Sequence, residues 1–211
     1  MITMALRLAG KRCVVIGGGP VAARRIALFL AEQAKITVVS PRVTPEIEAL
    51  ANSGQIIWHP QPYSETVDLE ADFVLLATSD SQLNEQVAQR ARSFGALVNR
   101  ADNRDDCDFT FPASVDIGDL QFAIFTGRVS PRLSRLMKQD LLKRYKPVAD
   151  ILPAFKKLRR EVRQLLPTPA ERETFWQTYL GEEQLAMIID GKWKRVEEIL
   201  NNAISSIRIK P

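Results

Sequence analysis

The chain has 211 residues, of which 45% are apolar and 26% charged; this composition excludes a disordered or fibrous protein and suits one or two globular domains. No apolar run approaches the roughly 18 residues that cross a bilayer, and the first ten residues lack the order of a secretory signal, so we expect a cytoplasmic protein. Two cysteines, Cys13 and Cys107, are too few for a disulfide framework, and neither belongs to a CxxC pair.

The formal net charge is +4, because 29 Lys and Arg residues outnumber 25 Asp and Glu residues. This excess favours anionic partners, which include nucleic acids, nucleotides and polycarboxylate metabolites. Few aromatic residues lie between the basic ones, and this argues against binding of single-stranded nucleic acid. The only histidine is His59, which argues against a His-dependent nucleophile and against a multi-histidine metal site.

The first hundred residues alternate short β-branched runs with longer amphipathic stretches, which predicts an α/β fold with a parallel sheet and crossover helices. The expected strands are 13–16, 36–39, 56–58, 73–77 and 96–98, and the expected helices are 20–33, 44–51 and 81–94. An added antiparallel strand is expected at Ala5–Leu8, before a turn at Gly10-Lys11. In the first helix, Arg24 and Arg25 are expected to point away from the apolar face.

After Asn99 the pattern changes. An acidic loop over 102–108 precedes two alternating runs, 109–115 and 120–126, which predict a β-hairpin. Ser130 is a good N-cap and Pro131 suits the first helical position, so a helix is expected from Pro131 to Tyr145. From Pro147 onward the chain is expected to be helical, with interruptions at Pro153, at 167–169, at Gly181 and at Gly191.

A G-x-G-x-x-A motif, Gly17 to Ala22, lies between the first strand and the first helix. Gly17 permits the tight turn, Gly19 lets a pyrophosphate approach the backbone, and Ala22 allows close helix–strand packing. This context favours dinucleotide binding over a merely glycine-rich turn. The expected cofactor-binding residues of the motif are Gly17, Gly19, Pro20 and Val21.

The second strand ends without the acidic residue that often holds the ribose of NAD. Ser40 and the backbone of Pro41 and Arg42 can hydrogen-bond a ribose, whereas the Arg42 side chain can pair with the extra phosphate of NADP or remain a solvated cation. The residues alone therefore do not decide between NAD and NADP as the cofactor. Thr78 and Asp80 follow the fourth strand and are expected at the cofactor cleft, a role compatible with capping the next helix.

Six short motifs occur in order along the chain: Val15–Ala22, Thr37–Pro41, Ala77–Asp80, Asn99–Asp102, Phe111–Ala113 and Ser130-Pro131. Together they resemble the precorrin-2 dehydrogenase family, the dehydrogenase module of siroheme synthases, and the likeness extends from about Leu6 to Tyr145. The resemblance implies oxidation of precorrin-2 to sirohydrochlorin with NAD as the hydride acceptor, on a homodimer. It also implies a Rossmann-like NAD-binding domain at 1–112, a dimerisation hairpin and helix at 113–146, and a small helical domain at 147–211.

Asp102 is the candidate catalytic residue. It follows the last parallel strand at the carboxyl edge of the sheet, and the resemblance implies that it accepts or orients the proton that precorrin-2 loses. The alternative is an acidic loop cap, because Asp105, Asp106 and Asp108 lie nearby. We expect no bound metal, since neighbouring acids in one loop cannot all converge on one ion.

Precorrin-2 is a polycarboxylate, so its site should present guanidinium groups. The substrate contacts expected from the sequence are Asn99, Thr126, Arg128, Ser130, Arg132 and Arg135. Helical spacing places Arg132 and Arg135 on one face, opposite an apolar stripe, and a solvated basic face explains this spacing equally well. At Thr126 and Arg128 the chain departs from the serine and glycine of some relatives, which puts those two contacts in doubt.

Two other functions remain open at this stage. A bifunctional enzyme would also insert ferrous iron into sirohydrochlorin, as some relatives do. A non-catalytic nucleotide-sensing module would bind the cofactor without turnover, and its basic helices would contact a partner. We expect neither a nucleic acid nor a membrane as the partner.

Overall fold

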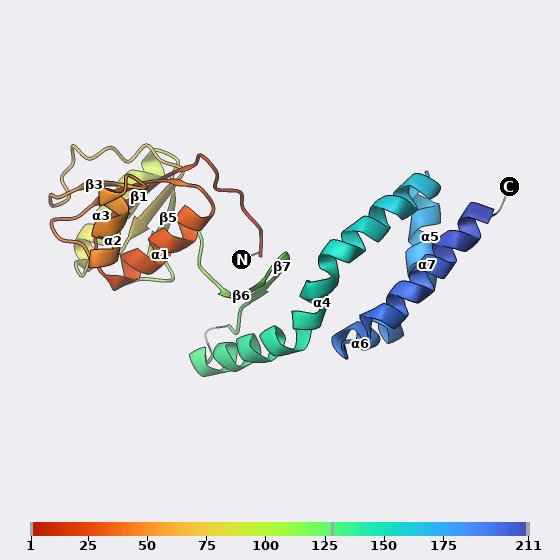
Figure 1. The fold of residues 1–211 in the computed structure, drawn as a ribbon. Coiled ribbons are helices and arrows are strands. Elements are labelled where there is room, and N and C mark those ends of the chain that lie inside the picture. Colours follow the sequence, from red (N-terminus) through yellow and green to blue (C-terminus); the bar gives the residue numbers. More distant parts are fainter. Residues whose placement is uncertain (1, 128, 210–211) are drawn as a thin grey trace. The chain divides into compact units, whose positions relative to one another are not determined.

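The computed structural model of the chain describes residues 2–127 and 129–209 (Figure 1). The chain divides into two compact units, Met1–Phe111 and Pro112–Pro211. Arg128, one of the expected substrate contacts, lies outside the described residues. The predicted further division of the second unit at residue 146 stays a prediction.

The first unit is built on a five-stranded parallel sheet with strand order β3-β2-β1-β4-β5, as the alternating pattern predicted. Two apolar clusters cover its two faces: one joins the sheet to α1 and α2, and the other joins it to α3. The elements are β1 (Arg12–Ile16), α1 (Pro20–Ala31), β2 (Lys35–Val39), α2 (Pro45–Asn52), β3 (Ile57–His59), β4 (Phe73–Leu76), α3 (Ser81–Ser93) and β5 (Leu97–Arg100).

The strand order reverses at β1, which has β2 on one side and β4 on the other. The pairing register aligns Ile16 with both Val39 and Leu76, so these strands end at one level. In open α/β sheets, ligands bind in the crevice outside the carboxyl ends of the strands at such a reversal. A ligand site is therefore expected at the loops that follow β1, β2, β4 and β5.

The antiparallel strand expected at Ala5–Leu8 is absent, and this prediction was wrong. Only the turn remains, in which the Lys11 N–H donates to the Leu8 carbonyl at 2.9 Å and Gly10 has φ +76°. The reason lies in the sheet topology: β1 already pairs on both edges, so a segment folding back beside it finds no free edge.

The second unit begins with the predicted hairpin, β6 (Ala113–Ile117) and β7 (Leu120–Ile124), joined by a two-residue turn in which Gly118 has φ +58°. Four helices follow: α4 (Pro131–Leu165), α5 (Pro169–Tyr179), α6 (Glu182–Ile189) and α7 (Trp193–Ile209). An apolar cluster formed by all four helices is the core of this unit. None of the described helices is long and apolar enough to cross a membrane.

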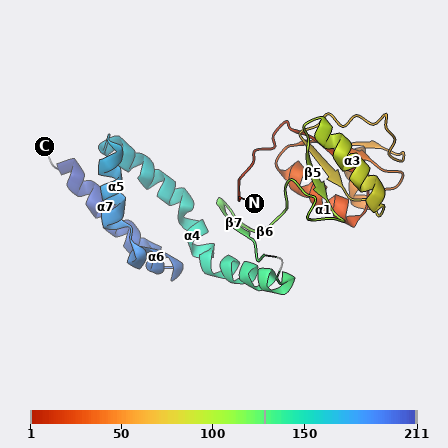
Figure 2. The same ribbon diagram turned by 180° about the vertical axis from the view of Figure 1, so that it is seen from behind.

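The helix α4 corrects two predicted boundaries. It continues through Pro147 and Pro153 to Leu165, although the sequence predicted an end near Tyr145 and an interruption at Pro153. A proline inside a helix removes one backbone hydrogen bond and bends the axis, and α4 is bent in both views (Figures 1 and 2). Packing compensates for the lost bonds, because α4 lies against the hairpin and also belongs to the core of the second unit.

Candidate functional site

The turn after β1 requires glycine at position 17. Gly17 has φ +111°, its N–H donates to the Val39 carbonyl at 3.0 Å, and a Cβ at this position would stand 2.6 Å from the Ala77 oxygen. Side chains rarely adopt this conformation, and the space is filled by the end of β4. The turn is therefore packed directly onto the segment that carries Ala77 and Thr78.

Gly18, which the motif treats as variable, is constrained as well. A Cβ here would lie 2.3 Å from the Arg42 carbonyl oxygen, and the Gly18 carbonyl accepts a hydrogen bond from the Thr44 N–H at 2.9 Å. The loop after β2 thus packs onto the glycine turn. Sequence analysis missed this role, because the contact joins residues more than twenty positions apart.

Gly19 is the N-cap of α1, and apart from its immediate chain neighbours no described residue has a heavy atom within 4 Å of the place where its Cβ would be. No side chain caps α1, so the N–H groups of its first turn face this open space. Ala22 is fully buried against the sheet, as the motif predicted. An open, uncapped helix N-terminus suits the pyrophosphate of a dinucleotide, and these residues fit an NAD(P) cofactor.

Gly19→Ala is expected to weaken cofactor binding without weakening the fold. The added methyl group meets no protein atom, and φ at this position is an ordinary −80°. It would occupy the space expected for the phosphates. We therefore expect about a tenfold or greater rise in the NAD dissociation constant, which corresponds to the loss of about 1 to 2 kcal/mol from a charge-assisted hydrogen bond. Fluorescence titration together with the urea midpoint checks this; unchanged NAD affinity would contradict the phosphate site.

The loop after β2 presents two exposed residues and one buried one. Ser40 is buried, its hydroxyl donates to the Arg42 carbonyl at 2.6 Å, and its own carbonyl accepts the Trp58 indole N–H at 2.9 Å. Pro41 and Arg42 are exposed. The hydroxyl proton of Ser40 is therefore used within the loop, and the groups presented outward are those of Pro41 and Arg42.

The residues after β4 are tied to α3. The Thr78 hydroxyl donates to the buried Asn84 side chain at 2.7 Å, and the Asp80 carboxylate caps α3 by accepting the Leu83 N–H at 2.9 Å. The expected cap is thus present at Asp80. Asn84, which sequence analysis missed, fixes the loop by also donating to the Thr78 carbonyl at 3.2 Å. Cofactor contacts of Thr78 and Asp80 stay predictions.

Asp102 lies at the same sheet edge, beside a buried arginine at the end of β5. Arg100 Nη2 donates to Asp102 Oδ2 at 2.8 Å, and the Ser81 hydroxyl donates to the same oxygen at 2.9 Å. The Arg100 side chain is only 4% exposed, whereas that of Asp102 is 17% exposed. Through the Ala101 N–H, which donates to the Leu76 carbonyl at 2.8 Å, this segment is anchored to the strand that contacts the glycine turn.

Partial burial raises the pKa of Asp102, but the hydrogen bonds from Arg100 and Ser81 outweigh burial and lower the pKa to about 2. Asp102 is therefore ionised throughout the neutral range. Because its pKa is lower in the folded chain than in the unfolded chain, the interaction stabilises the fold above about pH 4, and this contribution is lost as the pH falls toward 2.

Two other acids of the loop, Asp106 and Asp108, are paired as well. Asp106 bridges two arginines, at 2.7 Å from Arg100 Nη1 and 2.8 Å from Arg92 Nη1, and Asp108 accepts from Arg92 Nε at 3.1 Å. These ion pairs explain why the acidic run folds as a loop against α3. Within residues 2–127 and 129–209, no group of three His, Cys, Asp or Glu side chains is arranged to hold a metal ion.

Asn99 and Arg25 lie on the α1 side of this edge. Asn99 is buried, its amide donates to the Phe109 carbonyl at 2.7 Å, and its Oδ1 has no hydrogen-bond partner among the described residues. Arg25 was expected to point away from the core but is half-buried: its Nη1 donates to the Leu76 carbonyl at 3.4 Å, and its guanidinium lies over the Phe111 ring. Of the two, Arg25 lies near enough to Asp102 for their charges to interact.

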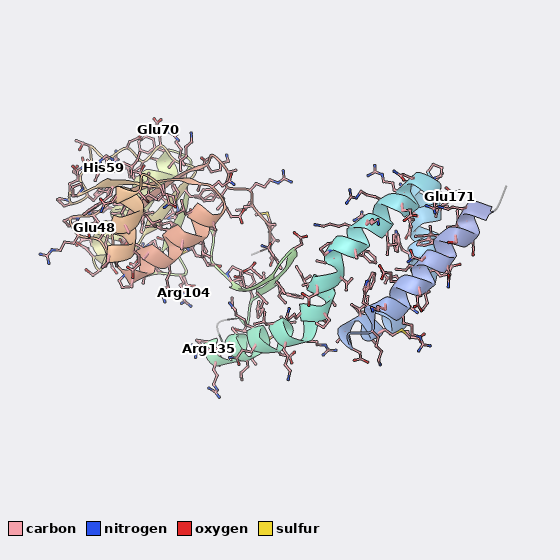
Figure 3. All side chains as sticks on the ribbon, in the orientation of Figure 1. Glu48, His59, Glu70, Arg104, Arg135 and Glu171 are labelled. Carbon is pink, nitrogen blue, oxygen red and sulfur yellow. The ribbon has the colours of Figure 1, made fainter. Side chains whose placement is uncertain are left out.

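The remaining expected substrate contacts belong to the second unit. The Thr126 hydroxyl pairs with that of Ser134 at 2.8 Å, and Ser130 caps α4 by accepting the Leu133 N–H at 3.2 Å. Arg132 and Arg135 are exposed on the first turns of α4, where Figure 3 labels Arg135. The cap confirms the predicted helix start, whereas substrate binding by these residues stays a prediction.

A cavity of about 460 Å³ in the first unit is a different place. It lies beside β1, β2 and β3 and the loop 61–70, with His59 and Glu70, both labelled in Figure 3, among its lining residues. None of the residues expected to bind cofactor or substrate lines it. The candidate site is instead the open sheet edge, where the glycine turn, the loop after β4 and Asp102 are joined by the contacts described above.

Comparisons with known proteins show which families the chain resembles. A family model described as putative NAD(P)-binding matches residues 4–113, and one described as the sirohaem synthase dimerisation region matches residues 146–204. Siroheme synthase of Pseudoalteromonas atlantica is 33% identical over 92% of this chain and 42% of its own length, and that of Mannheimia succiniciproducens is 36% identical over 78% and 35%.

The chain thus spans about two fifths of the length of these curated relatives. A solved structure, SirC, precorrin-2 dehydrogenase, superposes with a TM-score of 0.70 and 28% identity. That superposition covers 94% of this chain and 100% of the other. The similarity therefore extends over both units of the chain.

Proposed function

The chain belongs to the family of NAD(P)-binding siroheme synthase N-terminal modules and precorrin-2 dehydrogenases, and from this membership we propose that it oxidises precorrin-2 to sirohydrochlorin with NAD as the hydride acceptor. The observation that carries the proposal is the placement of an open glycine turn and an ionised Asp102 at one carboxyl edge of the sheet. The first suits the cofactor, and the second suits a substrate that becomes more positive as a hydride leaves.

The reaction removes a hydride and a proton from the reduced tetrapyrrole and extends its conjugation. The bound nicotinamide supplies the hydride acceptor. Asp102, with a pKa of about 2, is a weak base but a permanent negative charge. We therefore assign it to stabilise the positive charge that develops on the tetrapyrrole and to orient the departing proton by accepting its hydrogen bond. Substrate binding by Asn99 stays a prediction, because its unpartnered Oδ1 is buried from solvent.

The preference for NAD over NADP rests on the loop after β2. The Arg42 side chain is exposed and the Ser40 hydroxyl is used within the loop, so neither group is held in place to bind an additional phosphate. The exposed position of Pro41 and Arg42 suits contact with a ribose that has free hydroxyls. Arg42 as a simple solvated cation is consistent with this choice.

We also propose that the chain works as a homodimer. A dimerisation region is matched at residues 146–204. The start of α4 exposes an apolar stripe, in which Leu133, Leu136 and Met137 are 46%, 49% and 41% exposed. Sedimentation at twice the chain mass of 23.7 kDa checks this, and a monomer at micromolar concentration would contradict it. The cytoplasmic location stays a prediction. The expectation that neither a nucleic acid nor a membrane is the partner also stays a prediction.

The proposed activity is tested by mixing the purified chain with precorrin-2 and either NAD or NADP, without oxygen, while following nicotinamide reduction and the sirohydrochlorin spectrum. We expect one nicotinamide reduced for each tetrapyrrole oxidised, with kcat/KM for NAD at least about tenfold above that for NADP. Cofactor binding without turnover would instead support the sensing module, and a preference for NADP would identify Arg42 as a phosphate ligand.

A further inference from the structure

We propose that Arg100 and Ser81 are positioning residues that hold Asp102 by one carboxylate oxygen and turn the other oxygen toward the substrate, with Asp106 keeping Arg100 in place. This inference rests on the proposed function of Asp102. It concerns residues that the glycine motif and the acidic loop did not identify, and it explains why a buried arginine ends the edge strand β5.

The two oxygens of Asp102 are held differently. Among the described side chains, Oδ2 accepts from Arg100 Nη2 at 2.8 Å and from the Ser81 hydroxyl at 2.9 Å, whereas Oδ1 receives a longer contact from Arg100 Nε, at 3.4 Å. The backbone N–H of Asp102 also donates to this carboxylate. Two short donors from different elements, β5 and α3, fix the plane of the carboxylate. Oδ1 therefore retains most of its capacity to accept a hydrogen bond from a substrate.

Arg100 is in turn held from three sides. Its Nη1 donates to Asp106 at 2.7 Å, and its Nη2 also donates to the Ser81 carbonyl at 3.2 Å. Asp106 is fixed by Arg92 of α3 at 2.8 Å. Because the guanidinium is planar and buried, this bridge leaves Arg100 a single orientation, and that orientation determines where Asp102 lies.

An arginine bound to two carboxylates costs desolvation, and such a group is often no more stabilising than an apolar replacement. Stability alone does not explain its presence at this edge. The arginines whose charge interacts with that of Asp102 are Arg100, which lowers the pKa of Asp102, and Arg25 of α1, whose own pKa Asp102 raises. Of these, only Arg100 donates to the Asp102 carboxylate in the described hydrogen bonds.

The test compares Arg100→Met, Arg100→Lys and Ser81→Ala with a matched control, Asp72→Asn. Asp72 accepts from Lys11 Nζ at 2.7 Å and from the Arg12 N–H at 2.8 Å, at the opposite edge of the same sheet, so its loss perturbs an ion pair without reaching Asp102. Ser81→Ala removes only one hydroxyl and is the variant least able to disturb folding.

We expect kcat to fall about tenfold to hundredfold in Arg100→Met, less in Arg100→Lys, and severalfold in Ser81→Ala, with KM for NAD within twofold of wild type. Carbon-13 NMR titration of the Asp102 carboxyl, assigned with Asp102→Asn, supplies a second measurement on the free protein. The pKa should rise from about 2 toward the ordinary aspartate value of about 3.9 in Arg100→Met and Ser81→Ala, with partial recovery in Arg100→Lys.

The proposal would be overturned if the Asp102 pKa and kcat were unchanged in Arg100→Met and Ser81→Ala. It would also be overturned if kcat fell in these variants only as much as in Asp72→Asn. The NMR arm needs no substrate. Absence of precorrin-2 oxidation by the wild-type chain would refute the proposed function, whereas the titration would still show whether Arg100 and Ser81 hold Asp102.

Discussion

Asp102→Asn is expected to lower kcat for precorrin-2 oxidation by about a hundredfold or more while leaving NAD affinity within twofold of wild type. Asparagine has the same shape and can still accept hydrogen bonds from Arg100 and Ser81 through its carbonyl. It lacks the negative charge, so the tetrapyrrole loses its counter-charge as the hydride leaves. Steady-state rates and NAD titration on one preparation measure both quantities.

Asp68→Asn is a suitable control for this substitution. It makes the same change of carboxylate to amide in the first unit, at a loop position where Asp68 only accepts the Glu70 N–H. Retention of kcat within tenfold in Asp102→Asn would mean that Asp102 is a structural loop residue. Iron insertion into sirohydrochlorin, measured with the same proteins, tests the bifunctional alternative, and loss of iron insertion alone would contradict our assignment.

Gly17→Ala is expected to lower the free energy of unfolding by about 2 to 5 kcal/mol and to abolish measurable NAD binding. The left-handed backbone costs about 1 to 2 kcal/mol for any residue with a side chain, and overpacking against the Ala77 carbonyl adds about 1 to 3 kcal/mol. A methyl group 2.6 Å from a backbone oxygen forces the turn away from β4, so the N-terminus of α1 also moves. Urea unfolding and NAD titration measure the two effects.

Gly95→Ala separates the two causes. Gly95 has φ +83°, and nothing lies within 4 Å of its missing Cβ, so this substitution carries the backbone cost of about 1 to 2 kcal/mol without the collision. NAD affinity should be unchanged in Gly95→Ala. Equal destabilisation of the two variants would show that the packing of the turn against β4 contributes little.

Local sequence patterns predicted most of the sheet and its helices. The runs that became β1, β2 and β4 are rich in Val, Ile and Leu, which suits strands buried on both faces. Pro20 and Asp80 favour helix starts by their own chemistry. Ser130 at the start of α4 belongs to the same class. In each case the relevant interaction lies within a few residues, so the pattern contains it.

The wrong or missed features depend on distant residues. Arg25 is held by the Leu76 carbonyl and the Phe111 ring, which lie far along the chain, so its place in an amphipathic helix could not reveal it. Gly18 is constrained by the Arg42 carbonyl in the same way. Arg100 looked like one more cation before a group of acids, and only the fold shows it buried between Asp102 and Asp106.

The prolines inside α4 show a different limit. In an isolated helix, an interior proline lowers helix stability by about 3 kcal/mol, so ending the helix there is a sound prediction. That prediction does not include tertiary contacts, which can compensate for the cost. Pro147 lies in α4, which packs against the hairpin on one side of this proline and contributes to the core of the second unit on the other. Tertiary packing there outweighs the local preference.

The continuity of α4 couples the stability of the hairpin to that of the C-terminal helices. An isolated two-stranded hairpin is marginal in water, so β6 and β7 depend on the helix beneath them, where Phe122 rests on Tyr145. The same helix contributes Leu158 and Val162 to the distant core. Damage to that core should therefore be transmitted along α4, which contains about 50 Å of helix, and destabilise the strands that pack near Tyr145.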